Sequence, residues 1–356
     1  MRIGIVTQPL NDNYGGILQN WALQQVLKEL GHTPITLDAY MKYPRWRYLM
    51  SSSLTRISKI LNLNRNYPVK SSYGRISSSY TSDFIHENID LTKPFEEYNR
   101  NILIKNDIDA LVVGSDQVWR PKYNTNIYDM YLKFAKDFAC KKIAYAASFG
   151  VDEWEYNEEQ TNICRELLKT FTAISVRENS GVDLCRKYFG VDVAVVLDPT
   201  MLLSRDRYEE LCDDVPCMCK CDYLAVYCLD LDQDIYKLIK RIASKKNLKI
   251  QLFSAHGENS LTVPQWLSMF RDAKEVITDS FHGTVFSILF NKKFSVIQNG
   301  DRGNSRINTL NKNLNLNLKP NSDNILINDE IDDDRVYNSM INLRTNSYSF
   351  IKRALF

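Results

Sequence analysis

Short apolar runs alternate along this chain with segments whose apolar residues recur at helical spacing. The first run, Arg2–Val6, leads through a polar loop into a segment with apolar side chains every three or four residues: Leu23, Val26, Leu27 and Leu30. Such a run is typical of a buried strand, and such a recurrence indicates an amphipathic helix. Gly31 then ends the helix, and residues 34–37 begin another strand. The chain therefore opens with a Rossmann-like strand, helix and strand.

The same alternation continues and predicts an α/β fold of two Rossmann-like domains. Further buried strands are expected at residues 110–113, 143–147, 173–176, 193–197, 223–229, 249–253, 275–278 and 294–297. Because Pro199 marks a turn, we place the first domain at residues 1–198 and the second at 199–334. A C-terminal helix, within residues 335–356, is expected to pack back on the first domain.

Polar loops follow several of the predicted strands, and ligands of such folds collect at the carboxyl ends of the strands. Two stacked Rossmann-like domains would face these loops toward a shared cleft, which is the architecture of the glycosyltransferase B type. The G-x-G-x-x-G fingerprint is absent, so a dinucleotide is not indicated.

Composition narrows the function classes. The 356 residues carry a formal net charge of +2, which argues against a dedicated nucleic-acid binder. No apolar run reaches the length of a transmembrane helix, and the chain opens directly into a strand without a signal peptide. The 8 cysteines are too few and too irregularly spaced for a disulfide scaffold. We therefore expect a cytoplasmic protein.

The segment from Val276 to Gly283 carries the clearest chemical signal. It predicts a buried strand, a tight turn and a helix start, with His282 at the junction. A helix N-terminus has free N–H groups and favours an anion, and a histidine can deliver a proton near neutral pH. Phosphate binding with a proton donor is one interpretation, and a packed histidine in a strand-to-helix turn is the other.

Motifs at the predicted strand ends follow one another in a recognisable order. They are Asn13-Tyr14-Gly15-Gly16, then VGSDQVW (113–119), YAASFG (145–150), ISVRE (174–178), VLDPT (196–200), TDSFHGT (278–284) and SRI (305–307). Together they resemble the polysaccharide pyruvyl transferase family over nearly the whole chain. The resemblance implies transfer of a carboxyethylidene group from phosphoenolpyruvate to two hydroxyls of a sugar. Phosphate is released and a cyclic ketal forms.

The resemblance and the demands of this chemistry suggest roles for individual residues. His282 is the expected acid or phosphate contact, and Asp116 either accepts the proton of the sugar hydroxyl or caps a turn. Donor contacts are expected in the second domain and from the arginines, at Arg177, Arg306, Ser280, Gly283 and Ser305. Acceptor contacts are expected in the first domain, at Asn13, Tyr14, Gly15, Gly16, Gln117 and Trp119.

One position departs from the family pattern. Many members have an arginine two residues before the His-Gly pair, where this chain has Ser280. Contacts of that arginine cannot be transferred, so Arg177 and Arg306 are the candidate substitutes, each with an ordinary ion pair as the alternative. Phosphoenolpyruvate would be a co-substrate, and we expect neither a cofactor nor a metal ion.

Two further segments leave alternatives open. Cys217, Cys219 and Cys221 invite a zinc interpretation, but their spacing and the lack of a nearby histidine favour ordinary thiols. Residues 39–82 hold 8 of the chain's basic residues, with tyrosines and a tryptophan at the start: Lys42, Arg45, Arg47, Arg56, Lys59, Arg65, Lys70 and Arg75. This segment suits either the membrane surface and a lipid-linked sugar acceptor, or a solvated excursion.

The sequence therefore predicts a pyruvyl transferase acting on a hexose of the galactose type in a lipid-linked oligosaccharide, in capsular or exopolysaccharide assembly. It would act in the cytoplasm, at the inner face of the membrane if the basic segment binds lipid. A nucleotide-sugar glycosyltransferase of the same architecture and a non-catalytic carbohydrate-binding protein are the alternatives.

Overall fold

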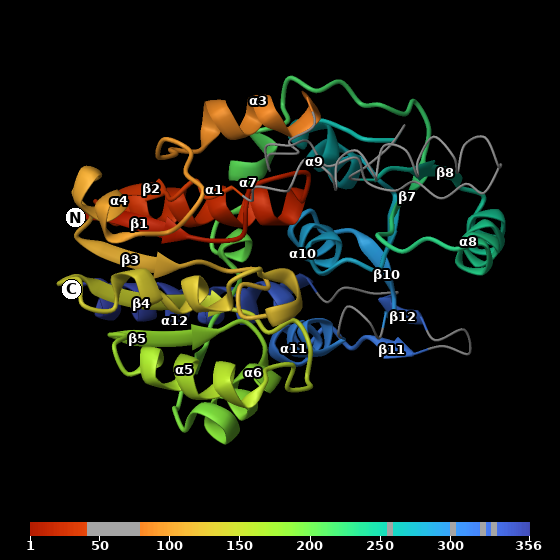
Figure 1. The fold of residues 1–356 in the computed structure, drawn as a ribbon. Helices are drawn as coiled ribbons and strands as arrows, with labels where there is room; N and C mark the ends of the chain where they lie inside the picture. Colours follow the sequence, from red (N-terminus) through yellow and green to blue (C-terminus); the bar gives the residue numbers. More distant parts are fainter. Residues whose placement is uncertain (41–78, 255–258, 300–303, 321–324, 329–332) are drawn as a thin grey trace, which may run out of the picture.

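Two separate sheets, each covered by helices, form the molecule (Figure 1). The computed structural model describes residues 1–40, 79–254, 259–299, 304–320, 325–328 and 333–356. Residues 41–78, which hold every basic residue of the segment proposed above for the membrane surface, lie outside the described residues.

The first sheet is parallel, with the strand order β2-β1-β3-β4-β5-β6. Its strands are β1 (Arg2–Val6), β2 (Thr33–Thr36), β3 (Ala110–Val113), β4 (Lys141–Ala147), β5 (Ala173–Val176) and β6 (Ala194–Val195). The helices of this half are α1 (Tyr14–Glu29), α3 (Ser79–Asn88), α4 (Arg100–Lys105), α5 (Glu158–Leu168) and α6 (Asn179–Leu184). This half also has 3₁₀ turns at Pro121–Tyr123, Ile127–Tyr131 and Lys133–Ala135 and a π-helical turn at Cys185–Phe189. Buried on both faces, parallel strands need apolar residues throughout, and all four residues of β3 are buried.

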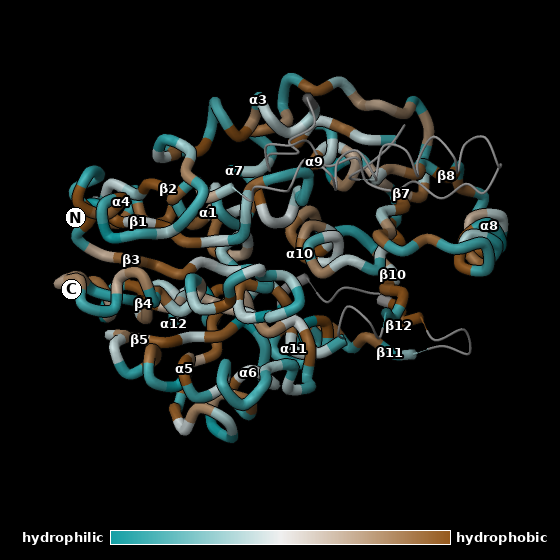
Figure 2. Tube along the Cα trace, in the orientation of Figure 1, coloured by the Kyte–Doolittle hydropathy of each residue, from teal (hydrophilic) through white to brown (hydrophobic). Residues whose placement is uncertain are grey.

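The second sheet has the order β11-β12-β10-β9-β7-β8. Its strands are β7 (Tyr223–Tyr227), β8 (Lys249–Leu252), β9 (Glu275–Thr278), β10 (Lys293–Ile297), β11 (Lys319–Pro320) and β12 (Ile325–Asn328). Its helices are α8 (Gln233–Lys246), α9 (Val263–Arg271), α10 (Phe281–Leu289) and α11 (Ser305–Leu314). Strands β7 to β10 are parallel, whereas β12 runs antiparallel to β10. Figure 2 shows hydrophobic residues along the strands and hydrophilic ones along outer helices such as α8.

The α/β fold with two parallel-rich sheets is confirmed. All ten strands expected from the apolar runs are present, although β6 keeps only two of the five predicted residues. Strands β11 and β12 were not predicted, since the runs that form them are short. Across the described residues, none of the helices is both long and apolar enough to cross a membrane.

The chain passes from the first sheet to the second after β6, and its last helix returns to the first sheet. After β6 the chain forms a 3₁₀ turn, Pro199–Met201, and helix α7 (Arg205–Glu209) before entering the second sheet. Helix α12 (Asp333–Leu355) then returns to the first sheet, where Lys141 Nζ donates to the Leu355 carbonyl (2.6 Å) and Leu197 N to Ser347 Oγ (3.0 Å).

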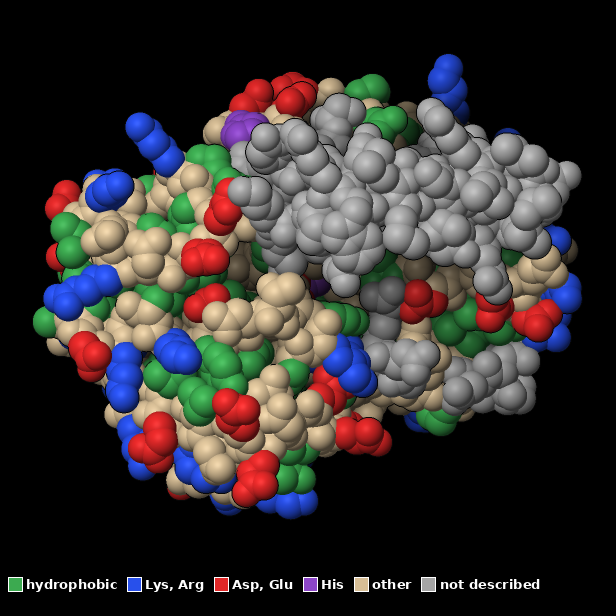
Figure 3. Space-filling model, viewed as in Figure 1, with side chains coloured by type: hydrophobic (Ala, Val, Ile, Leu, Met, Phe, Trp, Pro, Cys, Tyr) green, Lys and Arg blue, Asp and Glu red, His purple; other side chains and the backbone are tan. Residues whose placement is uncertain are grey.

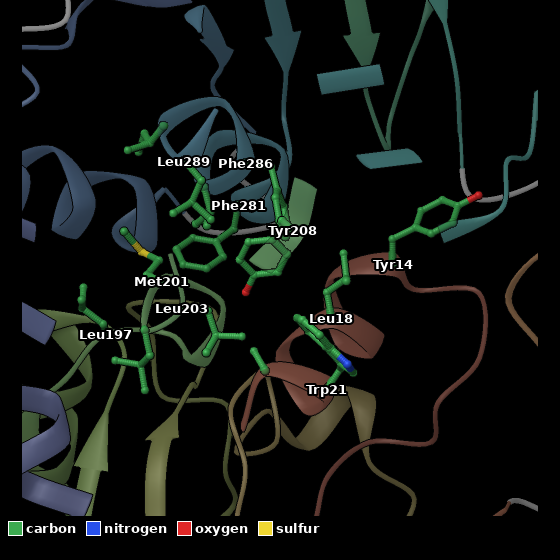
Figure 4. Close-up of a cluster of buried hydrophobic side chains, with 14 of the residues drawn as sticks. Tyr14, Leu18, Trp21, Leu197, Met201, Leu203, Tyr208, Phe281, Phe286 and Leu289 are labelled. Atoms are coloured by element: carbon green, nitrogen blue, oxygen red, sulfur yellow. The ribbon is translucent and has the colours of Figure 1, made fainter. Parts of the chain in front are cut away.

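One hydrophobic cluster extends from the first half into the second (Figure 4). Trp21 of α1 packs on Tyr208 of α7, with ring centroids 5.6 Å apart, and Tyr208 meets Phe286 of α10 at 5.0 Å. Burial of this apolar surface resists sliding or opening of the halves, because each large ring would return to water. The strand-end loops of the two sheets are thereby held against each other.

Candidate active site

A cavity of about 430 Å³ lies where the strand-end loops of the two sheets meet. Seven of the residues expected from the sequence line it: Asn13, Gly15, Asp116, Gln117, Ser280, His282 and Arg306. Other residues on the wall were not expected: Gln8, Asp12, Tyr123, Tyr227, Cys228, Leu229, Ser254, Asp279 and Phe281. Amides, carboxylates and aromatic rings on such a wall suit a hydroxyl-rich ligand, and Arg306 and His282 suit an anion.

Helix α10 begins at the cavity because the turn after β9 is well capped. Ser280 is the N-cap residue, and its hydroxyl accepts a hydrogen bond from Gly283 N (3.3 Å). The Thr278 hydroxyl donates to the Tyr227 carbonyl (2.6 Å) and occupies the space where a side chain at position 283 would lie. Gly283 is therefore required by packing against β9, and it does not line the cavity. The expected close approach of a ligand to Gly283 stays a prediction.

His282 is almost enclosed, with 6 % of its surface exposed, and its two ring nitrogens face different groups. Nε2 lies 3.6 Å from Asp198 Oδ2, an ion-pair distance longer than a hydrogen bond. Nδ1 lies against Gly15, where even a methyl group would overlap the ring. The imidazole is thus held between the loop after β6 and the start of α1.

Arg306 is the buried cation of the cavity wall. It is the second residue of α11 and has 7 % of its surface exposed. Burial and the nearby charge of Arg177 lower the pKa of Arg306 to about 10. A guanidinium placed where its charge is disfavoured gains most from an anionic ligand, because such a ligand offsets both the lost hydration and the repulsion.

Arg177 lies behind the cavity wall, and its guanidinium faces two carboxylates. Its Nη1 donates to Asp198 Oδ2 (2.6 Å), and its Nη2 lies 3.7 Å from Asp116 Oδ1. Phe281 covers the guanidinium, with the ring centroid 4.3 Å from Cζ, and the same ring lies 5.6 Å from Cζ of Arg306. The structure therefore brings both arginines to one ring but opens only Arg306 to the cavity.

Asp116 and Asn13 are coupled on the first-sheet side of the cavity. Asn13 caps α1 by accepting from Gly16 N (3.1 Å), and its amide donates to Asp116 Oδ2 (3.1 Å). Asp116 has φ of 74°, which is rare outside glycine and turns its carboxylate out of the strand direction. Gly16 itself lies beneath this pair, since a side chain there would crowd the Asn13 amide.

Two expected acceptor contacts belong instead to the interior. Tyr14 is fully buried, stacks on Trp266 with centroids 5.2 Å apart, and its hydroxyl bonds to both backbone groups of Leu261. Trp119 is also fully buried and donates to the Met130 carbonyl (3.2 Å). Neither side chain lines the cavity, because its polar atom is already satisfied within the fold. Ser305 is buried at the start of α11 and is likewise absent from the wall.

The unexpected wall residues share a position that sequence reasoning could have used. Gln8, Tyr227 and Asp279 each stand at or just after the carboxyl end of a strand, as β1, β7 and β9 end there. Asp279 accepts from the backbone N–H groups of Leu229 and Asp230 (2.7 and 3.0 Å), so it also fixes the loop after β7. Their position at the end of a strand could have identified these residues as lining the cavity. Their residue types alone indicated only that they lie in loops.

The cysteine cluster and the surface charges add no second site. Cys219 and Cys221 have their sulfur atoms 3.3 Å apart, and the described residues contain no group of three or more metal-ligating side chains placed to hold a metal ion. Lysine, arginine and acidic side chains are interspersed over the coloured part of the face in Figure 3, with no broad patch of one sign.

Comparison with known proteins agrees with this geometry. The family model described as polysaccharide pyruvyl transferase matches residues 13–301, so the chain belongs to the polysaccharide pyruvyl transferase family. The search of curated proteins found no match.

Solved structures resemble the chain in fold. A UDP co-structure of S. aureus MnaA is 12% identical, with 98% of this chain and 90% of that chain covered and a TM-score of 0.50. UDP-GlcNAc 2-epimerase from Methanocaldococcus jannaschii is 12% identical (96% and 92% covered, TM-score 0.47). An alpha-glucosyltransferase in complex with UDP and DNA is 10% identical (99% and 95% covered, TM-score 0.45). The S. aureus structure, at a TM-score of 0.50, supports the expected architecture of two stacked Rossmann-like domains, and at such identities the likeness concerns the fold alone.

Proposed function

We propose that the protein transfers a carboxyethylidene group from phosphoenolpyruvate to two hydroxyls of a hexose and releases phosphate. The observation that carries the proposal is the pairing of a buried cation, Arg306, with an enclosed imidazole, His282, on one wall of a cavity. Phosphoenolpyruvate needs both, because it is a compact polyanion and its C3 must receive a proton before C2 becomes electrophilic.

The residues divide the work as follows. Arg306 binds the carboxylate or phosphate of the donor, with help from the N-termini of α1 and α10, which both begin at the cavity. His282 gives its proton to C3. Asp116, which also lines the cavity, takes the proton of the sugar hydroxyl that attacks C2. Arg177 holds the carboxylates of Asp116 and Asp198 in place and does not contact the donor.

The transfer balances without a further reactant. A first C–O bond forms between the sugar and C2 while C3 becomes a methyl group. The C2–O bond to phosphate then breaks, and the second hydroxyl forms another C–O bond to C2. Of the two hydroxyl protons, one is balanced by the proton gained at C3 and the other leaves with phosphate.

The acceptor is proposed to be a galactose-like hexose of a lipid-linked oligosaccharide in capsular or exopolysaccharide assembly. Gln8, Asn13 and Gln117 offer amide groups on the first-sheet side of the cavity, where sugar hydroxyls would bond. A lipid-linked acceptor would bring the protein to the inner face of the cytoplasmic membrane.

The decisive experiment is incubation of the purified full chain with phosphoenolpyruvate and a panel of galactosides. We expect phosphate release that depends on the acceptor, and a product mass increased by one carboxyethylidene group. Parallel reactions receive UDP-sugars instead of phosphoenolpyruvate. Sugar transfer from a UDP-sugar, with no release of phosphate from phosphoenolpyruvate, would replace this proposal with the glycosyltransferase alternative.

A further inference from the structure

Asp198 lies directly behind His282 and is held on every side. Its Oδ2 accepts from Arg177 Nη1 (2.6 Å) and Ser115 Oγ (2.8 Å) and lies 3.6 Å from His282 Nε2. Its Oδ1 accepts from the backbone N–H and the hydroxyl of Thr200 (3.0 and 2.6 Å). With 1 % of the residue exposed, this carboxylate cannot turn away from the imidazole.

The carboxylate stays charged in this position. Burial by itself would raise the pKa of Asp198, but His282, Arg177 and Thr200 outweigh burial and hold that pKa well below its usual range. A fixed anion beside an imidazole favours the protonated ring. Arg177 opposes this effect, because it shares the same oxygen and brings a positive charge close to the ring.

Asp198 also determines how the His282 ring is oriented. With Nε2 toward Asp198, the opposite nitrogen, Nδ1, is toward Gly15 on the cavity side. If His282 acts as the proposed acid, the proton that it gives to a ligand is the one on Nδ1, while the Nε2 side remains with the carboxylate.

We propose that Asp198 is the positioning residue of the acid: it fixes the His282 ring with Nδ1 toward the cavity and stabilises the imidazolium against the charge of Arg177. The part of this inference that concerns catalysis rests on the proposed function. The coupling between Asp198 and His282 does not, since it can be measured without substrate.

Two substitutions remove opposite charges from the same ion pair. Asp198→Asn removes the anion that stabilises the His282 imidazolium, so the midpoint of the NMR titration of this ring is expected to move to lower pH. The alkaline limb of the kcat–pH profile moves down with it. Arg177→Gln removes the competing cation, so the same midpoint and limb move up. Ser115→Ala is the matched control, because it takes one hydrogen bond from Asp198 without a change of charge, and it leaves both unshifted.

The measurement is a pH titration of the histidine side chains by NMR on the full chain labelled at histidine. The chain has 4 histidines, and the signal of His282 is the one missing in His282→Gln. The other charged groups of the cavity wall, Asp12, Asp116, Asp279 and Arg306, are unchanged in every variant. Thermal unfolding shows which variants remain folded, and if Asp198→Asn does not fold, a downward or absent shift in Arg177→Gln overturns the inference.

Opposite shifts in the two variants support the inference. Shifts of the same sign, or an unshifted His282 in a folded Asp198→Asn, overturn it, because a purely structural role would loosen the site similarly in both. Should the NMR shifts appear as expected while wild-type protein fails to release phosphate from phosphoenolpyruvate, the coupling stands and the proposed function fails.

Discussion

Gly15, at the start of α1, lies directly against the imidazole of His282, at the start of α10. The two residues belong to different sheets, so the N-termini of two helices converge on one ring. Each helix N-terminus favours negative charge, and the space between them is the cavity with Arg306 on its wall. The contact explains why glycine stands at position 15: any side chain there would push the ring or the helix away.

Gly15→Ala is expected to lower turnover strongly. The added methyl group overlaps His282 Nδ1, so the ring or α1 must shift, and a displacement of about 1 Å at a reacting group can cost on the order of a hundredfold in rate. Gly114→Ala is the control, because its methyl group would meet neighbours at ordinary contact distance, 3.5 Å and beyond. Steady-state phosphate release measures both. Equal activity in the two variants would show that the contact does not position the acid.

His282→Gln is expected to keep donor binding and lose the proton transfer. Glutamine retains a hydrogen-bond donor of similar reach, whereas loss of a general acid typically costs roughly a hundredfold to ten-thousandfold in rate. Calorimetry with phosphoenolpyruvate and single-turnover kinetics separate the two effects. His86→Gln, on helix α3 and absent from the cavity wall, is the matched control. Turnover near that of wild type in His282→Gln would exclude this residue as the acid.

Arg306→Met is expected to weaken donor binding. A hydrogen bond to a charged group contributes about 1.5–3 kcal/mol, so the dissociation constant should rise roughly tenfold to a hundredfold. Arg306→Lys restores binding only in part, because an ammonium lacks the planar fork. Arg186→Met, at an exposed ion pair with Asp192, is the control and leaves binding unchanged.

Tyr14→Phe is expected to reduce stability but not acceptor recognition. Its hydroxyl joins α1 to the N–H and carbonyl of Leu261, so its removal leaves two backbone groups unpaired and costs about 1–3 kcal/mol of unfolding free energy. Tyr337→Phe, at a position 63% exposed, is the control. Denaturant unfolding and the KM for the sugar are the measurements. A raised KM with unchanged stability would return Tyr14 to the acceptor site.

Asp129→Asn is expected to stabilise the protein at neutral pH only. Burial raises the pKa of Asp129 to about 6, against partial compensation by Asn126 and Lys133. The folded state therefore binds this proton more tightly than the unfolded state, and its contribution to stability declines as pH rises from about 4 to about 6. Thermal unfolding of wild type and variant at pH 4 and pH 7.5 tests the sign. A difference that does not change between the two pH values would contradict it.

The strands could be predicted because their signal is local. Runs such as Ala110–Val113 are apolar throughout, and only a strand buried on both faces satisfies such a run in an α/β fold. The positions of the strand ends then predicted part of the cavity wall, because the loops after parallel strands meet at one edge of the sheet. His282, Asp116, Asn13 and Arg306 were found by that reasoning and by the family resemblance, and all four line the cavity.

The residue types at a strand end did not predict whether their side chains face the cavity or the interior. Tyr14 and Asn13 are neighbours in one motif, yet Asn13 lines the cavity while Tyr14 enters the aromatic cluster of the second half. Arg177 and Arg306 were both expected to contact the donor, but Arg177 meets two carboxylates behind the wall, whereas Arg306 lines the cavity. Such differences depend on tertiary contacts, between residues that are 21 positions apart for Arg177 and Asp198 and 247 apart for Tyr14 and Leu261.

The sequence by itself determined the alternation of strands and helices, the two-sheet fold and the family, because periodicity, capping residues and motif order are properties of short segments. Only the tertiary structure decided the partners of each charge, the side chains that reach the cavity and the central position of Asp198. The reason is physical: burial fixes a side chain through whatever packs around it, and those neighbours come from the other sheet and from the returning helix α12.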